Sequence, residues 1–244
     1  MKKTFQSQEI SINRAGYLPG LENETIEWKK IEYQNFDQII QLSLPDLNSK
    51  QYETLSHHVK TIGRDQLKNT SLDEILNAID AVILKLLDMK NQCMKDALIA
   101  ISIVTGFDGE MLKINLHQYL KTFRLHHLKH FLVQDFINPS VLESFQPNVI
   151  GGFHKAVSPE LIVHNWSGNV PAIGLWSFIS SLLVKAPSIG KLPSAEPIFI
   201  SLFVKLLVEE IPKIKDAFAV VWWQGGDFSK SQALLNQAEL IIAY

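Results

Sequence analysis

One stretch of the sequence, residues 161–197, constrains the fold more than any other because strand and helix patterns alternate within it. Residues 161–163 form a short apolar run with two β-branched side chains, and residues 166–169 after it favour a turn. Apolar side chains then recur at helical spacing over residues 174–185, and a second strand is predicted at 188–191. Strands that alternate with helices predict a parallel sheet, in which ligands bind outside the carboxyl ends of the strands.

The same alternation continues to the end of the sequence. Glu196 and Pro197 open a helix, since Pro suits the first helical turn. This helix is apolar on nearly all sides. Residues 217–223 predict a buried strand, residues 229–236 a helix and residues 239–244 a last strand. A strand of this kind normally leads into a further loop and helix, so we expect the chain to be cut short. The predicted fold class is α/β.

The first half of the chain is predicted to be mostly helical. Ser71 and Glu74 form a capping box at the start of an amphipathic helix. A second helix is predicted over about residues 92–105, where Gly106 provides a left-handed cap. Helical spacing over residues 110–134 predicts a third region, in two pieces.

Two domains are expected. Weak apolar patterns predict short strands at residues 5–12 and 26–36, and Pro and Gly residues between 139 and 152 mark a boundary. We therefore expect residues 1–150 to form a mostly helical N-terminal region with a short β arm. Residues 151–244 are expected to form a Rossmann-like cofactor domain that is incomplete at its C-terminal end.

Composition excludes some functions without identifying one. A net charge of -2 and a pI near 6.4 give no reason to expect nucleic acid or an anionic membrane as a partner. The sequence has neither the apolar start of a secretory signal nor an apolar run of about 18 residues for a membrane span, so the cytosol is expected. His126 and His130 are four residues apart on a predicted helix but lack a third ligand, so no metal is expected.

Three short motifs at predicted strand ends resemble one family. They are Ser167-Gly168-Asn169-Val170-Pro171, then Gly190-Lys191 with Ser194, Glu196 and Pro197, and finally Trp223 with Gly225-Gly226-Asp227. They resemble the bacterial fatty-acyl-CoA reductases of the LuxC type, which feed aldehyde to luciferase in luminous bacteria and belong to the aldehyde dehydrogenase superfamily. The resemblance covers about the last third of the chain, and the first 150 residues carry no motif of this kind.

The resemblance implies an aldehyde-dehydrogenase-like fold and a set of site residues. It implies that Asn169 is the side-chain donor to the oxyanion of the reacting acyl group. The alternative is that Asn169 is present only because Asn suits the backbone of a turn. The residues expected to bind the cofactor are Ser167, Gly168, Lys191, Ser194, Glu196, Gly225 and Gly226. A Gly-Gly pair before a helix allows close approach of a pyrophosphate, but it is also common in ordinary strand-to-helix turns.

NADPH is the expected cofactor. By resemblance, Lys191 faces the adenosine ribose, and Ser194 occupies the position where many NAD-using relatives place an acidic residue. A neutral hydroxyl there removes the repulsion that would exclude a 2′-phosphate. Glu196, two residues further on, is a carboxylate that weakens this preference.

The resemblance also predicts the reaction, which is reduction of long-chain acyl-CoA to fatty aldehyde through a thioester on a cysteine downstream of this chain. Cys93 precedes the cofactor motifs and is interpreted as a buried helix residue, so these 244 residues alone are expected to be inactive. The family implies a homo-oligomer and an acyl group delivered by an acyl-transferring synthetase. Two alternatives stay open, which are a reductase of another activated acyl group and a non-catalytic remnant that binds nucleotide or a partner.

Overall fold

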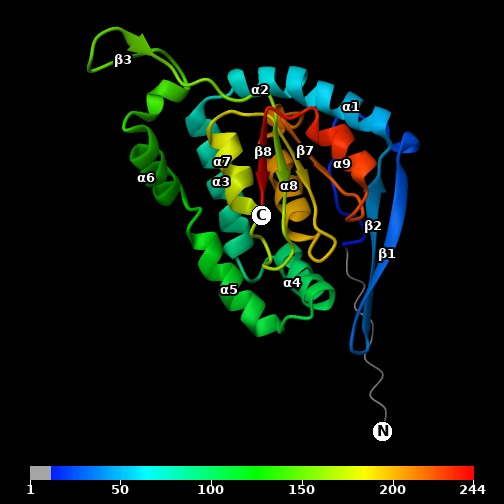
Figure 1. The fold of residues 1–244 in the computed structure, drawn as a ribbon. Coiled ribbons are helices and arrows are strands. Elements are labelled where there is room, and N and C mark those ends of the chain that lie inside the picture. Colours follow the sequence, from blue (N-terminus) through cyan, green and yellow to red (C-terminus); the bar gives the residue numbers. More distant parts are fainter. Residues whose placement is uncertain (1–11) are drawn as a thin grey trace.

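A four-stranded parallel sheet forms the centre of the molecule in a computed structural model that describes residues 12–244 (Figure 1). All neighbouring strands are parallel, in the order β7-β6-β5-β8. The strands are β5 (Ile162–Asn165), β6 (Ser188–Lys191), β7 (Phe218–Val221) and β8 (Leu240–Ala243). Each overlaps a segment that was predicted as a strand, so the predicted α/β class and parallel sheet are confirmed.

Helices cover both faces of this sheet (Figure 1). One face packs against α3 (Leu72–Leu87), α7 (Leu175–Leu183) and α8 (Phe199–Glu210), and the other against α1 (Ser49–His58) and α9 (Phe228–Leu235). The remaining helices are α2 (Arg64–Lys68), α4 (Gln92–Thr105), α5 (Gly109–Lys121) and α6 (Leu125–Phe136), with a π-helical turn at Val59–Gly63 and 3-10 turns at Asn23–Thr25, Pro139–Leu142 and Pro212–Ile214. Burial on both faces explains why β7 is apolar throughout.

The helix ends follow the local signals in the sequence. Ser71 accepts a hydrogen bond from the backbone N–H of Glu74 at 3.3 Å, and the Glu74 carboxylate accepts from the N–H of Ser71 at 2.9 Å, which confirms the capping box. Gly106 ends α4 with φ of 75°, as a left-handed cap requires. The predicted third helical region is indeed divided in two, as α5 and α6.

The β arm is a hairpin that packs on its own chain. Its first strand, β1 (Glu27–Asn35), matches the prediction, but the second, β2 (Gln38–Asp46), was not predicted. The hairpin lies against α4, and Asp46 forms a parallel bridge with Trp222 just after β7. The strand predicted at residues 5–12 lies outside the described residues, apart from Ile12.

The interpretation of Cys93 as a buried residue is wrong. Its side chain is exposed, whereas Met94 and Ala97 on the same helix are buried. Cys93 lies in the first turn of α4, on the side that borders a pocket of about 460 Å³ between α4, α8 and residues 12–17. The buried apolar positions of α4 begin at Met94 and do not include Cys93.

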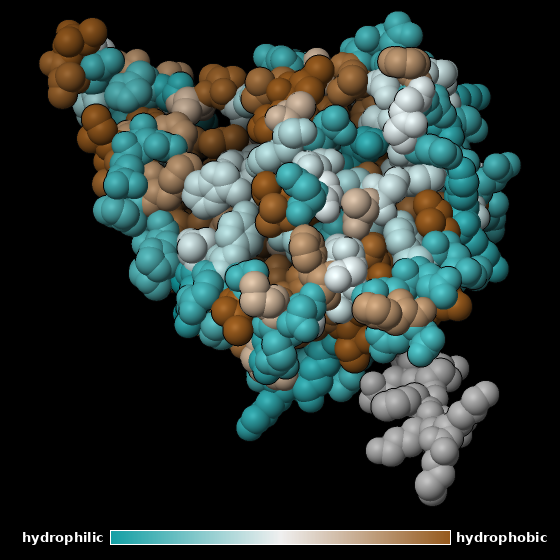
Figure 2. Space-filling model, turned by 60° about the horizontal axis from the view of Figure 1, so that its bottom comes forward, coloured by the Kyte–Doolittle hydropathy of each residue, from teal (hydrophilic) through white to brown (hydrophobic). Residues whose placement is uncertain are grey.

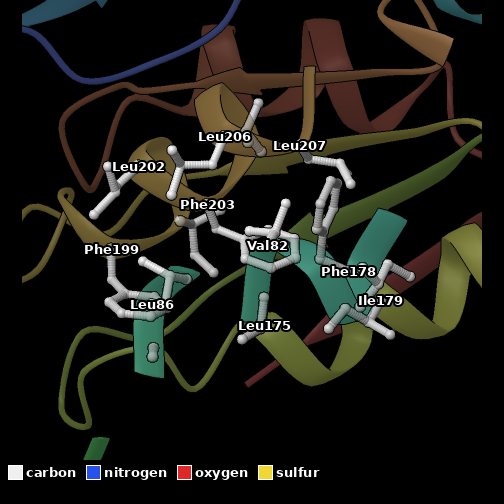
Figure 3. Packing of buried hydrophobic residues seen from close by; sticks show 14 of the residues in the cluster. Val82, Leu86, Leu175, Phe178, Ile179, Phe199, Leu202, Phe203, Leu206 and Leu207 are labelled. Carbon is white, nitrogen blue, oxygen red and sulfur yellow. The ribbon is translucent and has the colours of Figure 1, made fainter. Parts of the chain in front are cut away.

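Aromatic and aliphatic side chains from α3, α7 and α8 interlock under the sheet (Figure 3). Phe178 of α7 makes edge-to-face contacts with Phe203 of α8 and Phe218 of β7, at ring-centroid distances of 6.1 Å and 5.3 Å. This cluster joins α3, from the first half of the chain, to the sheet in the second half. The predicted division near residue 150 stays a prediction.

A small hairpin projects from the body near α6. It consists of β3 (Gln146–Pro147) and β4 (Phe153–His154), and its apolar side chains form part of a hydrophobic tip at the upper left of Figure 2. The exposed side chains around it are Phe145, Val149, Ile150, Phe153 and Val157. Among residues 12–244, no helix has the length and apolar character needed to cross a bilayer.

Phe203→Ala should destabilise the protein by about 3–5 kcal/mol, because it removes a fully buried ring from this core. Phe153→Ala is the matched control, since that ring is 72% exposed and its loss should change stability by less than about 0.5 kcal/mol. The free energy of unfolding from urea titrations measures both changes. Similar values for the two variants would contradict the assigned core.

Candidate functional site

Three loops meet at the edge where the parallel strands end. They follow β5, β6 and β7. These strands end side by side, because Asn165 is in register with Lys191, and Lys191 with Val221. Figure 2 turns this end of the molecule toward the viewer and shows hydrophilic and apolar residues mixed there. The structure therefore brings the site residues predicted from the three motifs to one edge of the sheet.

Trp166 anchors the first of these loops. Its indole is 3% exposed and donates a hydrogen bond from Nε1 to the Ser177 hydroxyl at 3.1 Å. Gly190 of β6 and Gly174 before α7 leave room for the ring, since a Cβ atom on them would lie 1.9 Å and 2.7 Å from ring atoms. His164 stacks beside it, with 5.5 Å between ring centroids. The loop that carries Asn169 thus starts from a rigid base.

Asn169 presents an unused amide at this edge. The Ser167 hydroxyl donates to the Asn169 side-chain oxygen at 2.7 Å, which orients the amide. The Asn169 amide nitrogen has no hydrogen-bond partner among the described residues, and the side chain is exposed. An oriented amide N–H of this kind is the group that an oxyanion requires.

The loops after β5 and β6 are packed together. A Cβ atom on Gly168 would lie 2.8 Å from the Ala195 side chain and 3.0 Å from that of Pro193, so only glycine fits there without a shift. Close packing therefore accounts for Gly168, whose predicted contact with a cofactor stays a prediction.

The buried carboxylate of Glu196 links the loop after β5 to the start of α8. Its carboxylate is 4% exposed and accepts hydrogen bonds from the N–H groups of Ile198 and Phe199 at 2.9 Å and of Ala172 at 3.4 Å. Burial raises the pKa of Glu196 to about 7, although these three hydrogen bonds favour the ionised form. This placement favours a positioning role for Glu196 over the predicted contact with a cofactor.

Lys191 and Ser194 lie near two tryptophans at the end of β7. The Lys191 ammonium lies 5.3 Å from the ring centroid of Trp223, and burial lowers the pKa of Lys191. The Ser194 hydroxyl accepts a hydrogen bond from Trp222 Nε1 at 3.0 Å. The Tyr33 hydroxyl donates to the Ser194 carbonyl oxygen at 2.8 Å.

Sequence reasoning missed Tyr33 and Trp222 as site residues. Trp222 was interpreted as a core residue, which its 2% exposure supports, but its indole N–H also holds Ser194. Tyr33 has no signal in the sequence beyond its place in a strand, because it reaches Ser194 from a hairpin 161 residues away.

Gly225 and Gly226 form an open turn before α9. A Cβ atom on either would meet nothing within 4 Å, and Gly226 has φ of 91°. Asp227 then caps the helix by accepting from the Lys230 N–H at 3.1 Å. Open space beside a helix N-terminus suits an anionic group such as a pyrophosphate. Among residues 12–244, no group of three His, Cys, Asp or Glu side chains is placed to hold a metal ion.

Comparison with solved structures defines the class of fold. Aldehyde dehydrogenase 21 from Physcomitrella patens is 12% identical with a TM-score of 0.69, and the match covers 95% of this chain and 47% of that one. Betaine aldehyde dehydrogenase from Staphylococcus aureus is 11% identical with a TM-score of 0.69, over 96% of this chain and 46% of that one. The chain therefore has an aldehyde-dehydrogenase-like fold and spans about half the length of these proteins.

The family model for acyl-CoA reductase (LuxC) matches residues 67–244. The chain belongs to this family, as its three motifs suggested. The long-chain acyl-protein thioester reductase of Aliivibrio fischeri is 29% identical over 93 residues, which are 37% of this chain and 19% of that protein. The chain thus matches about a fifth of this curated relative.

Stability should fall as pH rises from about 4.5 to about 7, because the pKa of Glu196 is higher in the folded than in the unfolded chain. A shift of this size corresponds to about 3 kcal/mol, present below the unfolded pKa and lost as the carboxyl ionises in the buried site. Glu196→Gln should remove most of this slope, and Glu209→Gln, an exposed control, should keep it.

Urea unfolding of all three proteins at a series of pH values between 4.5 and 8 measures the slope. Equal slopes in wild type and Glu196→Gln would show that the Glu196 carboxyl is not the group responsible.

Proposed function

We propose that this chain forms the cofactor-binding part of a reductase that converts long-chain acyl thioesters to fatty aldehydes with NADPH. Membership of the acyl-CoA reductase (LuxC) family supports acyl reduction. The observation that carries the proposal is the oriented and unpartnered amide of Asn169 beside the loops that follow β6 and β7. An oxyanion donor and a nucleotide site would then share one edge of the sheet.

Asn169 would act on the acyl group. Reduction adds a hydride to the thioester carbonyl carbon, and the carbonyl oxygen becomes an oxyanion that then reforms the carbonyl as the thiolate leaves. The Asn169 N–H would donate to this oxygen and stabilise the charge that develops in the transition state. We place the thiolate on a cysteine beyond these 244 residues, since Cys93 lies on α4 beside a pocket formed by α8 and residues 12–17.

NADPH would supply the hydride, and several residues suit its binding. Lys191 has no carboxylate partner among the described residues, and Ser194 offers a neutral hydroxyl. The open turn at Gly225 and Gly226, followed by the N-terminus of α9, suits the pyrophosphate. Ser167 orients Asn169 and would affect the cofactor only indirectly.

Several further features belong to the same proposal. The acyl group would come from an acyl-transferring synthetase, and the protein would work in the cytosol as a homo-oligomer. The name of the Aliivibrio fischeri relative, a long-chain acyl-protein thioester reductase, supports an acyl group carried on protein.

In the complete gene product, Asn169→Ala should lower kcat for NADPH-dependent acyl-CoA reduction about 100- to 1,000-fold, because one oxyanion donor is lost. The Kd for NADPH should stay unchanged. Asn77→Ala, an exposed change on α3, is the matched control and should keep full activity.

Steady-state rates measure kcat, and calorimetric titration measures the Kd for NADPH. A kcat for Asn169→Ala within twofold of wild type would refute the oxyanion role. A complete protein that oxidises no NADPH with any acyl thioester, but reduces an acyl phosphate, would favour a different activated acyl group.

A further inference from the structure

The loop after β5 is held at two points by the segment between β6 and α8. Gly168 packs against that segment, since a Cβ atom on it would lie 2.8 Å from the Ala195 side chain and 3.1 Å from the Glu196 backbone nitrogen. Four residues further on, the Ala172 N–H donates to the Glu196 carboxylate at 3.4 Å. Asn169 lies between these two contacts, so the position of its amide depends on both.

Ala172 has a backbone conformation that alanine seldom adopts. The Ile173 N–H donates to the Val170 carbonyl oxygen at 3.3 Å, which closes a tight turn over residues 170–173. Pro171 and Ala172 are the central residues of this turn, and φ of Ala172 is 65°. A positive φ at the third position of a turn is typical of glycine, because a Cβ atom crowds the backbone there. Contacts from outside the turn must therefore hold it in this conformation.

The two carboxylate oxygens of Glu196 have different partners. Oε1 accepts from the N–H groups of Ile198 and Phe199, both at 2.9 Å, at the start of α8. Oε2 accepts from the Ala172 N–H and from no other group in the described part of the chain. Capping of α8 therefore accounts for one oxygen, and the other oxygen is free to hold the turn.

Burial makes the contact between Glu196 and Ala172 costly to lose. Ala172 is 1% exposed and Glu196 is 4% exposed, so water does not replace the carboxylate if it is removed. A buried N–H without an acceptor destabilises the conformation that buries it. The turn at residues 170–173 should therefore shift when the Ala172 N–H loses its acceptor.

We propose that Glu196 is a positioning residue, whose buried carboxylate holds the turn at residues 170–173 and thereby fixes the Asn169 amide at the edge of the sheet. The inference rests on the proposed function, because Asn169 is the oxyanion donor in that function. Glu196 itself contacts neither the acyl group nor the cofactor in this role. Its effect on the reaction passes through the loop that carries Asn169.

Glu196→Gln separates the two contacts of the carboxylate. The glutamine oxygen can still accept from Ile198 and Phe199, whereas its NH2 group is a donor and cannot accept from the Ala172 N–H. We would assay the complete gene product at pH 8, which is above the pKa of about 7 of Glu196. The variant should lower kcat for NADPH-dependent acyl-CoA reduction about 10- to 100-fold, because the oxyanion donor is misplaced. The Kd for NADPH should stay unchanged.

A double variant tests whether Glu196 acts through Asn169. In an Asn169→Ala background, Glu196→Gln should have no further effect on kcat, because the amide that it positions is already absent. Thr70→Val is the matched control. It removes another buried hydrogen bond, which the Thr70 hydroxyl donates to the Gln66 carbonyl oxygen at 2.8 Å outside the loops of the site, and it should leave kcat unchanged.

Hydrogen exchange over residues 166–175, read by mass spectrometry, reports on the loop independently of catalysis. Exchange should be faster in Glu196→Gln than in wild type or in Thr70→Val. Unchanged exchange, or effects of Glu196→Gln and Asn169→Ala on kcat that simply multiply, would overturn the positioning role and leave the proposed function intact. A wild-type protein that reduces no acyl thioester would instead refute the proposed function, and with it any catalytic use of the turn.

Discussion

The site depends on how the buried indole of Trp166 fits between two glycines. Its ring covers Gly190 of β6 and Gly174 before α7, and its N–H is bound by Ser177, so one side chain spaces two strands and a helix. The loop with Asn169 leaves directly from this ring. A side chain at either glycine would push the indole away and displace the loop that carries the Asn169 amide, because interiors are too densely packed to absorb such a change.

Local signals predicted the helices and strands of the second half because each depends on neighbours in sequence. The cap at Gly106 and the strand at residues 188–191 are examples. What could not be predicted depends on partners far away in the chain. The exposure of Cys93 is one example, since it follows from how α4 packs, with Met94 and Ala97 buried and Cys93 beside a pocket. The second strand of the hairpin, residues 38–46, was missed although Ile40, Leu42 and Leu44 alternate with other residues, which is a local strand signal.

The candidate site shows the same division. Asn169, Lys191 and Ser194 lie at one edge because the carboxyl ends of parallel strands must meet there, and this was predictable. Glu196 is two residues from Ser194 and equally polar, yet it is buried. Its carboxylate accepts from the N–H groups of Ile198 and Phe199 just ahead in the chain, and also from that of Ala172, which is 24 residues away. The contact with Ala172 has no local pattern in the sequence.

The four strands of the sheet are protected from solvent to different degrees. β6 lies between two strands and is buried, whereas β8 is paired only with β5 among the described residues and is largely exposed. Its pairing with β5 also joins segments that are distant in the chain, since Ile162 is in register with Leu240. Local opening is cheapest where few buried contacts oppose it, so amide hydrogens of β8 should exchange with solvent long before those of β6.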